Sequence, residues 1–302
     1  CGESCTAWRL FMIFTIKNDK FTAKVDTLGA QIISLEDAQG RELLWTGDPA
    51  YWREHAPVLF PIVGALRDNR VKIKDAWFEM TRHGFAKHKE FDLVRRGEGD
   101  IFLRLQDDGD TKKAYPFSFA LTVEYALTEE GYATAFTVEN TGKEPLPFAI
   151  GGHPGFNLPL EDGAEFEDYV LRFEQEESQQ CPTVRMDTGL LDYETPGFAL
   201  EGREIPLRHS LFYRDALVFS GLNSHKAAIV NKKTGKGIEM DFAGFPMLGV
   251  WSAQNDGPYV CLEPWTGCAT LTTEGDEFTG KKGMITLSPG EKTERRFTVR
   301  VM

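Results

Sequence analysis

The chain has 302 residues, of which 41% are hydrophobic, 12% aromatic and 26% charged, so it has enough apolar material for a substantial core. Its formal net charge of −12 argues against a nucleic-acid partner, because binding to a phosphate backbone requires clustered Lys and Arg side chains. The sequence holds no apolar run as long as a transmembrane helix, and we expect no membrane partner.

The cysteines also restrict the class of protein. They are Cys1, Cys5, Cys181, Cys261 and Cys268, an odd number without a close CxxC pair. This spacing speaks against a disulfide framework or a zinc site and favours reduced thiols, a cytoplasmic location and no bound metal. Residues 1–11 precede the first strand-like pattern, so we expect an N-terminal extension, or added residues, outside a domain that spans 12–302.

Strand patterns dominate the chain after Met12. Alternating, β-branched and aromatic segments, separated by DG, EEG and NTG turn signals, predict strands along the whole chain. These segments are 21–25, 31–36, 91–96, 101–105, 117–127, 132–140, 169–174, 216–220, 226–230, 238–242, 247–251, 284–288 and 295–301. Residues 70–80 predict a hairpin that turns near Lys74 and Asp75, whereas 161–168 and 202–207 have the composition of loops.

Helical periodicity is almost absent. The best candidate for a short helix is 48–55, with Asp48 as a possible N-cap and Pro49 at the first helical position. Many strands with short connections predict an all-β fold, a large antiparallel sandwich with few short helices, rather than βαβ units. We find no internal repeat and no linker, which favours a single domain.

His153 lies in the segment GGHPGF, directly after the apolar strand-like run PLPFAI. Pro154 restricts the backbone of His153 to extended geometry, and the neighbouring glycines allow a close approach of a ligand. A histidine that only satisfies a turn carbonyl is the structural alternative. The stiffness of the segment favours a functional imidazole at a strand end.

Two further side chains have a context that suggests chemistry. Glu263 follows the apolar run YVCL and precedes Pro264 and Trp265, and a carboxylate buried there would have a raised pKa, as suits a general base. An ion pair with a structural role is the alternative for Glu263. His83 lies in RHGF and is a weaker candidate by itself, and His88 has the context of a solvated residue.

Residues near these segments are candidates for binding a sugar. Aromatic rings can stack on the apolar face of a pyranose, although core packing is the default role of any one of them. Arginine, asparagine and aspartate side chains can hydrogen-bond to hydroxyl groups. The aromatic candidates are Phe85, Phe156, Trp251 and Trp265, and the polar candidates are Arg67, Asp68, Asn69, Arg82 and Asp215.

Taken together, these segments resemble the aldose 1-epimerase (galactose mutarotase) superfamily, and most closely its bacterial LacX-like branch. The resemblance covers nearly the whole chain from about Met12, and its motifs occur in the family's order. These motifs are LFPIVGALRDN, RHGFAKHKEF, GGHPGFNLP, DALVF, FPMLGVWS and YVCLEPW. The resemblance implies a β-supersandwich with an open sugar-binding cleft and no cofactor.

The resemblance also implies a role for individual residues. Glu263 matches the general base that removes the proton from the C1 hydroxyl, and His153 matches the general acid that protonates the ring oxygen. His83 matches the first active-site histidine, and Asp215 matches the acid that holds sugar hydroxyls. The family's sugar-contacting arginine usually follows the glycine at Gly64, where this chain has Ala65, so that Arg67 or Arg82 would have to replace it.

The residues thus favour a mutarotase that acts on an aldohexose, as a monomer or a homodimer. A hexose-6-phosphate epimerase is the first alternative, and it would need several of Arg67, Arg70, Arg82, Lys87 and Lys89 to converge on a phosphate. A carbohydrate-binding or sugar-sensing protein without activity is the second, although it would not need a matched acid and base. A glycosidase would need two carboxylates that flank the scissile bond.

Overall fold

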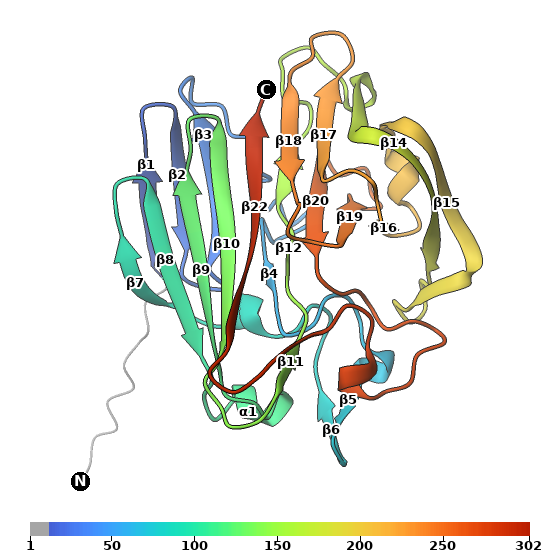
Figure 1. Ribbon diagram of the computed structural model, residues 1–302. Coiled ribbons are helices and arrows are strands. Elements are labelled where there is room, and N and C mark those ends of the chain that lie inside the picture. Colours follow the sequence, from blue (N-terminus) through green and yellow to red (C-terminus); the bar gives the residue numbers. More distant parts are fainter. Residues whose placement is uncertain (1–11) are drawn as a thin grey trace.

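The computed structural model describes residues 12–302 and arranges them in five sheets, the largest of nine strands (Figure 1). This sheet has the order β15-β14-β17-β18-β22-β10-β9-β8-β7 and extends from the right of Figure 1 to the left. Its strands are β7 (Asp92–Arg96), β8 (Asp100–Gln106), β9 (Phe119–Leu127), β10 (Gly131–Asn140), β14 (Tyr169–Val184), β15 (Leu191–Pro206), β17 (Lys226–Asn231), β18 (Gly237–Asp241) and β22 (Lys292–Val301).

A second sheet of six strands carries the residues of chemical interest and has the order β16-β19-β20-β12-β4, with β13 also paired to β20. Its strands are β4 (Val58–Leu59), β12 (Gly151–Gly152), β13 (Gly155–Asn157), β16 (Leu217–Ser220), β19 (Met247–Trp251) and β20 (Tyr259–Trp265). The named strand pairs of both sheets are antiparallel, as expected for sheets with short connections.

The remaining elements are short. Three small sheets consist of β1 (Ile13–Lys17), β2 (Phe21–Asp26) and β3 (Gln31–Asp37), of β5 (Arg70–Ile73) and β6 (Ala76–Glu79), and of β11 (Leu146–Phe148) and β21 (Ile285–Leu287). The described helices are α1 (Thr111–Ala114) and the 3₁₀ turns Arg67–Asn69, Ala86–His88, Phe166–Asp168, His209–Phe212 and Phe278–Gly280. None of the helices within 12–302 has the length and apolarity of a membrane span.

The alternation of side chains along β20 divides this strand between two environments. Val260 and Leu262 point into the main hydrophobic core, which the large sheet also lines. Cys261 and Glu263, together with Trp265, lie on the opposite face of the strand and outside that core cluster. The six-stranded sheet therefore has one face for the core and one for a site.

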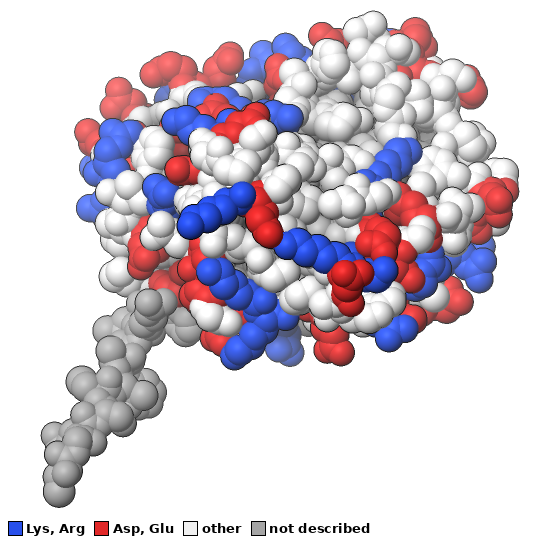
Figure 2. All heavy atoms as spheres, turned by 60° about the horizontal axis from the view of Figure 1, so that its bottom comes forward, with Lys and Arg blue, Asp and Glu red and all other residues white. Residues whose placement is uncertain are grey.

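Charged side chains of both signs are interspersed on the face of the molecule that Figure 2 shows. Ion pairs join Lys72 of β5 to Glu277 at 2.9 Å, and Lys74 to Glu144 at 2.6 Å. Such exposed pairs contribute little to stability, on the order of 0–1 kcal/mol each.

The structure confirms the all-β class and the hairpin at 70–80, in which Lys74 has a positive φ of 56° at the turn. The prediction of a helix at 48–55 is wrong, since only a turn forms at 49–51. The Asp48 side chain accepts the N–H of Ala50 at 2.9 Å, as a cap would. The Trp52 carbonyl, however, accepts the indole N–H of Trp45 at 2.7 Å, and the chain does not continue as a helix.

The prediction of a loop at 202–207 is also wrong, because β15 continues to Pro206. This strand contains Pro196, Gly197 and several acidic residues, which obscure a strand pattern. It lies at the edge of the large sheet, where proline and charge are tolerated. The expected extension at 1–11 lies outside the described residues.

Candidate active site

A cleft with a volume of about 290 Å³ lies on the face of the six-stranded sheet that does not contact the main core. This volume is at the lower end of the range for small-molecule sites, roughly 300–1,000 Å³. Glu263, Gly249 and Val218 are paired across β20, β19 and β16, so they lie side by side on this face. Because Gly249 has no side chain, the indole of Trp265 can lie over the sheet between the carboxylate and the valine.

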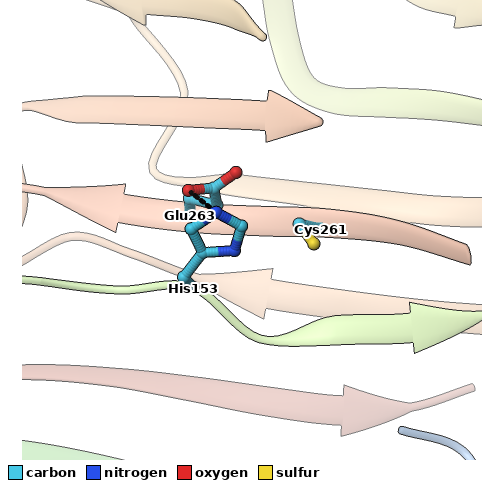
Figure 3. Close-up of side chains that lie close together, drawn as sticks. All are labelled: His153, Cys261 and Glu263. Carbon is cyan, nitrogen blue, oxygen red and sulfur yellow. Dashed lines mark ion pairs between the residues drawn. The ribbon is translucent and has the colours of Figure 1, made fainter. Parts of the chain in front are cut away.

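The His153 and Glu263 side chains meet in the cleft, with Nε2 of the imidazole 3.0 Å from Oε2 of the carboxylate (Figure 3). His153 follows β12, and Glu263 lies on β20. Ladder pairs of Gly151 with Trp265 and of Gly155 with Cys261 hold the two segments together on both sides of the histidine. The backbone thus fixes the contact between the two side chains.

Glu263 is only 1% exposed, and its burial raises the pKa of its carboxyl above the ordinary value of 4.5. The neighbouring carboxylate of Asp215 raises this pKa further, whereas His153 and Arg82 lower it by stabilising the charged form. The balance is upward. A carboxyl group with a raised pKa in contact with an imidazole is suited to proton transfer near neutral pH.

His83 lies close to this pair, with its ring at a centroid distance of 5.6 Å from that of His153. Its Nδ1 accepts the backbone N–H of Gly64 at 3.1 Å. Burial lowers the pKa of His83 well below 6.5, and the positive charges near it act in the same direction. The imidazole is therefore neutral, carries its proton on Nε2 and is available as a hydrogen-bond donor.

Both basic side chains that line the cleft are paired with a carboxylate. Arg82 places Nη1 and Nη2 3.3 Å from Oδ2 of Asp215, and Lys87 Nζ lies 3.1 Å from Oε1 of Glu54. Glu263 adds another acidic group. Positive charge is therefore not in excess among the described residues of the cleft.

His83 and Asp215 both have a positive φ, of 70° and 75° respectively. This conformation is uncommon outside glycine, and such strained residues concentrate at functional sites. In both cases the strained residue presents its side chain to the cleft.

Aromatic rings surround the imidazole of His153. Trp52 lies at a centroid distance of 4.8 Å from it, and Trp251 lies at 5.6 Å with nearly perpendicular ring planes. Trp265 covers Gly249, where an added Cβ would come within 2.6 Å of the indole ring. The cleft thus combines polar groups with flat apolar surfaces.

The structure brings Glu263, His153, His83, Arg82, Asp215, Trp251 and Trp265 together, as the sequence suggested. It places the other candidates elsewhere. Phe156 is completely buried in the main core, and Phe85 packs against Phe60 there. Asn69, like Asp68, is exposed in a 3₁₀ turn outside the cleft.

Arg67 also points away from the cleft. Its Nη2 donates to the carbonyl oxygens of Leu271 and Glu274 at 3.2 and 2.8 Å, and its Nε to Asp276 at 3.2 Å. This guanidinium holds the loop after Ala269 in place. By contrast, a Cβ added at Gly189 would lie 3.1 Å from Cβ of Ala65 and 3.0 Å from Nη2 of Arg82, so Arg82 reaches the space beside Ala65.

Sequence reasoning missed part of the cleft wall. Trp52 lies in the segment 48–55, for which the sequence predicted a helix rather than part of a cleft. The aromatic character of the residues that follow Pro49 is the one local feature that points to a ligand-binding role. Val184 at the end of β14, Gly189 in the following turn and Leu191 at the start of β15 also line the cleft, and no motif marks this turn. Their position depends on how the long ribbon folds over the sheet.

His153 and Glu263 of the cleft lining form, with the fully buried Cys261, a set of side chains that has the composition of a metal site. Ligand atoms of His153, Cys261 and Glu263 all lie within 4.8 Å of one another. Cys261 and Glu263 are two residues apart on β20 and thus share a face of the strand, so this set has no CxxC-type spacing in the sequence.

Comparisons with known proteins agree with this architecture. Residues 12–300 match the family described as aldose 1-epimerase. The chain is 35% identical over 299 residues to the chromosomal LacX protein of Lactococcus lactis subsp. lactis, covering 96% of this chain and all of that protein.

Among solved structures, a galactose mutarotase related enzyme from Lactobacillus acidophilus superposes with a TM-score of 0.91 at 31% identity, covering 96% of this chain and 97% of that one. A galactose mutarotase-like protein from Lactobacillus casei superposes with a TM-score of 0.87 at 29% identity, covering 96% of this chain and 100% of that one. The fold is therefore galactose mutarotase-like, and the chain belongs to the aldose 1-epimerase family.

Proposed function

We propose that the protein is a mutarotase that interconverts the α and β anomers of an aldohexose by acid–base catalysis. The contact of 3.0 Å between His153 Nε2 and Glu263 Oε2 carries this proposal. The oxygens O1 and O5 of a pyranose are both bonded to C1, so the base and the acid of ring opening have to act side by side. A carboxylate and an imidazole in contact meet this requirement.

Ring opening then proceeds in one concerted exchange of protons. Glu263 takes the proton from the C1 hydroxyl, the C1–O5 bond breaks as the C1–O1 bond becomes the aldehyde, and His153 gives a proton to O5. Rotation about C1–C2 presents the other face of the aldehyde. Reclosure reverses the roles of the two residues, and each transfer is worth roughly 10²–10⁴-fold in rate.

The surrounding residues position the sugar. The neutral His83 donates from Nε2 and can hydrogen-bond near the ring oxygen, where negative charge develops as the C1–O5 bond breaks. Arg82 and Asp215 can bind hydroxyl groups, and we propose that Arg82 replaces the arginine that the family has at the position of Ala65. Trp251 and Trp265 supply flat surfaces for the sugar ring.

The phosphosugar alternative has less support. A phosphate needs several uncompensated cations, and in the cleft Arg82 and Lys87 are already paired with Asp215 and Glu54. A purely binding role also has less support. Burying the Glu263 carboxyl raises its pKa and costs folding free energy, and a protein that only binds sugar does not need a proton acceptor in return for this cost.

An exchange assay by NMR or polarimetry tests the proposal. Freshly dissolved α-glucose, α-galactose and their 6-phosphates are equilibrated with and without the protein. Acceleration of the free sugars supports a mutarotase, and acceleration of the phosphates alone supports the phosphosugar epimerase. If all four equilibrate at the uncatalysed rate while sugar binding is detectable, the protein is a binding protein.

A further inference from the structure

We propose that His153, Cys261 and Glu263 form a binding site for a thiophilic divalent cation such as zinc, and that the bound cation blocks the acid–base pair. The three ligand atoms, which are one imidazole nitrogen, one thiol sulfur and one carboxylate oxygen, lie within 4.8 Å of one another (Figure 3). The inhibition rests on the proposed function, whereas the binding of the cation does not.

The backbone holds the three residues at this spacing. Cys261 and Glu263 project from the same face of β20, and His153 lies in the segment that pairs with β20 through Gly151 and Gly155. The N–H of Leu262 also donates to the carbonyl of Pro154 at 3.3 Å. A ligand set on paired strands is preorganised, which reduces the ordering that metal binding requires.

The donor atoms suit zinc. Zinc binds Cys, His and Glu at about 2.0–2.3 Å in tetrahedral geometry, which sets neighbouring donors about 3.3–3.5 Å apart. The imidazole and carboxylate are slightly closer than this, at 3.0 Å, whereas the separations in the set reach up to 4.8 Å, so the side chains have to rotate to bring the sulfur closer. Three protein ligands leave the fourth position open toward the cleft, where a water molecule can bind.

The local environment also favours a cation. Cys261 and Glu263 are 0% and 1% exposed, and His153 is 8% exposed. His153 Nδ1 is buried and has no hydrogen-bond partner among residues 12–302. Glu263 Oε2 is likewise buried without a hydrogen-bond partner in this part of the chain. A buried carboxylate oxygen without a hydrogen bond is costly, and a cation bound to it relieves this cost. The thiol proton leaves to solvent when the sulfur binds the metal.

A bound cation would stop proton transfer at this site. It occupies a lone pair of His153 and neutralises the charge of Glu263, the two groups that exchange protons with the sugar in the proposed mechanism. Cys261 has no role in that mechanism. The role of Cys261 in this proposal is to supply the sulfur ligand, so that the activity of the acid–base pair depends on whether a thiophilic metal is available.

Cobalt(II) is a suitable probe, because a cobalt–thiolate bond has a charge-transfer absorption that reports the sulfur ligand directly. The full chain is used with Cys1 and Cys5 replaced by serine, so that thiols outside the described residues do not contribute. The comparison is between this background, the variants Cys261→Ser and His153→Asn, and the matched control Cys268→Ala. Cys268 is another buried free cysteine, in a separate apolar cluster.

We expect one equivalent of cobalt to bind to the background and to Cys268→Ala with the thiolate band, and zinc to displace it. Cys261→Ser should lose the band and bind at least about 10–100-fold more weakly, and His153→Asn should also bind more weakly. No band in the background protein, or an unchanged band in Cys261→Ser, overturns the site. Circular dichroism confirms that each variant is folded.

Inhibition is measured separately, as the ratio of rates with and without zinc, in the background protein, Cys261→Ser and Cys268→Ala, which all keep the proposed acid and base. If zinc no longer slows Cys261→Ser but still slows Cys268→Ala, the inhibitory role of the bound cation is supported. If cobalt binds as expected but the protein accelerates no sugar, the proposed function is wrong while the metal site stands. If zinc binds without inhibition, the regulatory part of the proposal is wrong.

Discussion

The backbone N–H of Gly64 donates to Nδ1 of His83, at a distance of 3.1 Å. This bond requires a lone pair on Nδ1, so the proton of the neutral ring is on Nε2. His83 itself is held in place by its own backbone, whose N–H donates to the carbonyl of Gly64 at 2.9 Å. The two residues thus present a neutral donor to the cleft.

The tautomer of His83 is a direct prediction. We expect His83 to remain neutral as the Nε2–H form at pH 6.5, because burial and the charges of Arg82 and Lys87 lower its pKa. Long-range ¹H–¹⁵N correlation spectra of the imidazoles measure this state. The exposed His88, in the next turn, serves as a comparison within the same spectrum. A protonated His83 at this pH, or an Nδ1–H tautomer, would contradict the assignment.

Replacement of the acid and the base should abolish turnover. We expect Glu263→Gln and His153→Asn to reduce kcat by about 10²–10⁴-fold each, because each substitution removes one proton-transfer group. The reduction is read from the anomer exchange rate, and sugar binding from calorimetry. His88→Ala is the control, since His88 is exposed and outside the cleft. A loss in His88→Ala as large as in His153→Asn would mean that the wrong histidine was assigned.

The pH dependence of kcat/KM should report the raised pKa of the Glu263 carboxyl. This carboxyl has to be ionised to accept a proton, and its pKa is raised above 4.5, so activity should fall on the acidic side at a pH above that value. Asp215 contributes to the raised pKa. In Asp215→Asn the acidic limb should therefore move to lower pH, whatever happens to KM. An unchanged limb in that variant would show that another group limits the rate.

The two arginines of the neighbouring loops should separate into different roles. Arg82→Gln should raise KM at least about tenfold, because a charged hydrogen-bond donor to the sugar is worth about 1.5–3 kcal/mol. Arg67→Gln should leave KM nearly unchanged and lower the free energy of unfolding by about 1–3 kcal/mol, since its bonds hold the loop at 271–276. Steady-state kinetics and urea denaturation measure both. The opposite pattern would restore Arg67 as the sugar-binding arginine.

Gly249, which the indole of Trp265 covers, should tolerate no side chain. A Cβ there would lie 2.6 Å from the indole of Trp265, so we expect Gly249→Ala to lower the free energy of unfolding by about 1–3 kcal/mol and to reduce activity. Urea denaturation and the exchange assay measure the two effects. Gly109→Ala is the matched control, because an added Cβ meets no atom within 4 Å. Equal stability of the two variants would contradict this account of the cleft floor.

Much of the fold was predictable because the strands are strongly patterned. Segments such as 117–127 and 132–140 are rich in β-branched and aromatic residues, and they form β9 and β10 as expected, although residues 131–136 of β10 are all buried. The ribbon of β14 and β15 was only half predicted. Its register shifts and edge position relax the alternation that makes a strand recognisable.

The candidate site was predictable where one segment combines a reactive side chain with backbone stiffness, as at His153 in GGHPGF and Glu263 in CLEPW. The role of Arg67 was not predictable, because an arginine in a polar loop has the same local sequence whether it binds a ligand or holds the loop in place. Whether that guanidinium enters the cleft or binds the carbonyls of Leu271 and Glu274 depends on a loop that is distant in sequence. Phe156 shows the same limit, because its register with Val260 turns it into the core.

Periodicity, turn residues and local motifs are properties of short segments, so they suffice to predict the β architecture and the family and to nominate candidate residues for the chemistry. Which of these residues meet depends on the tertiary fold. Strand pairing across β12, β13 and β20 sets His153 against Glu263 and brings Cys261 within reach of both. The same folding buries the carboxyl group of Glu263 and raises its pKa, because desolvation depends on neighbours that lie far away in the chain.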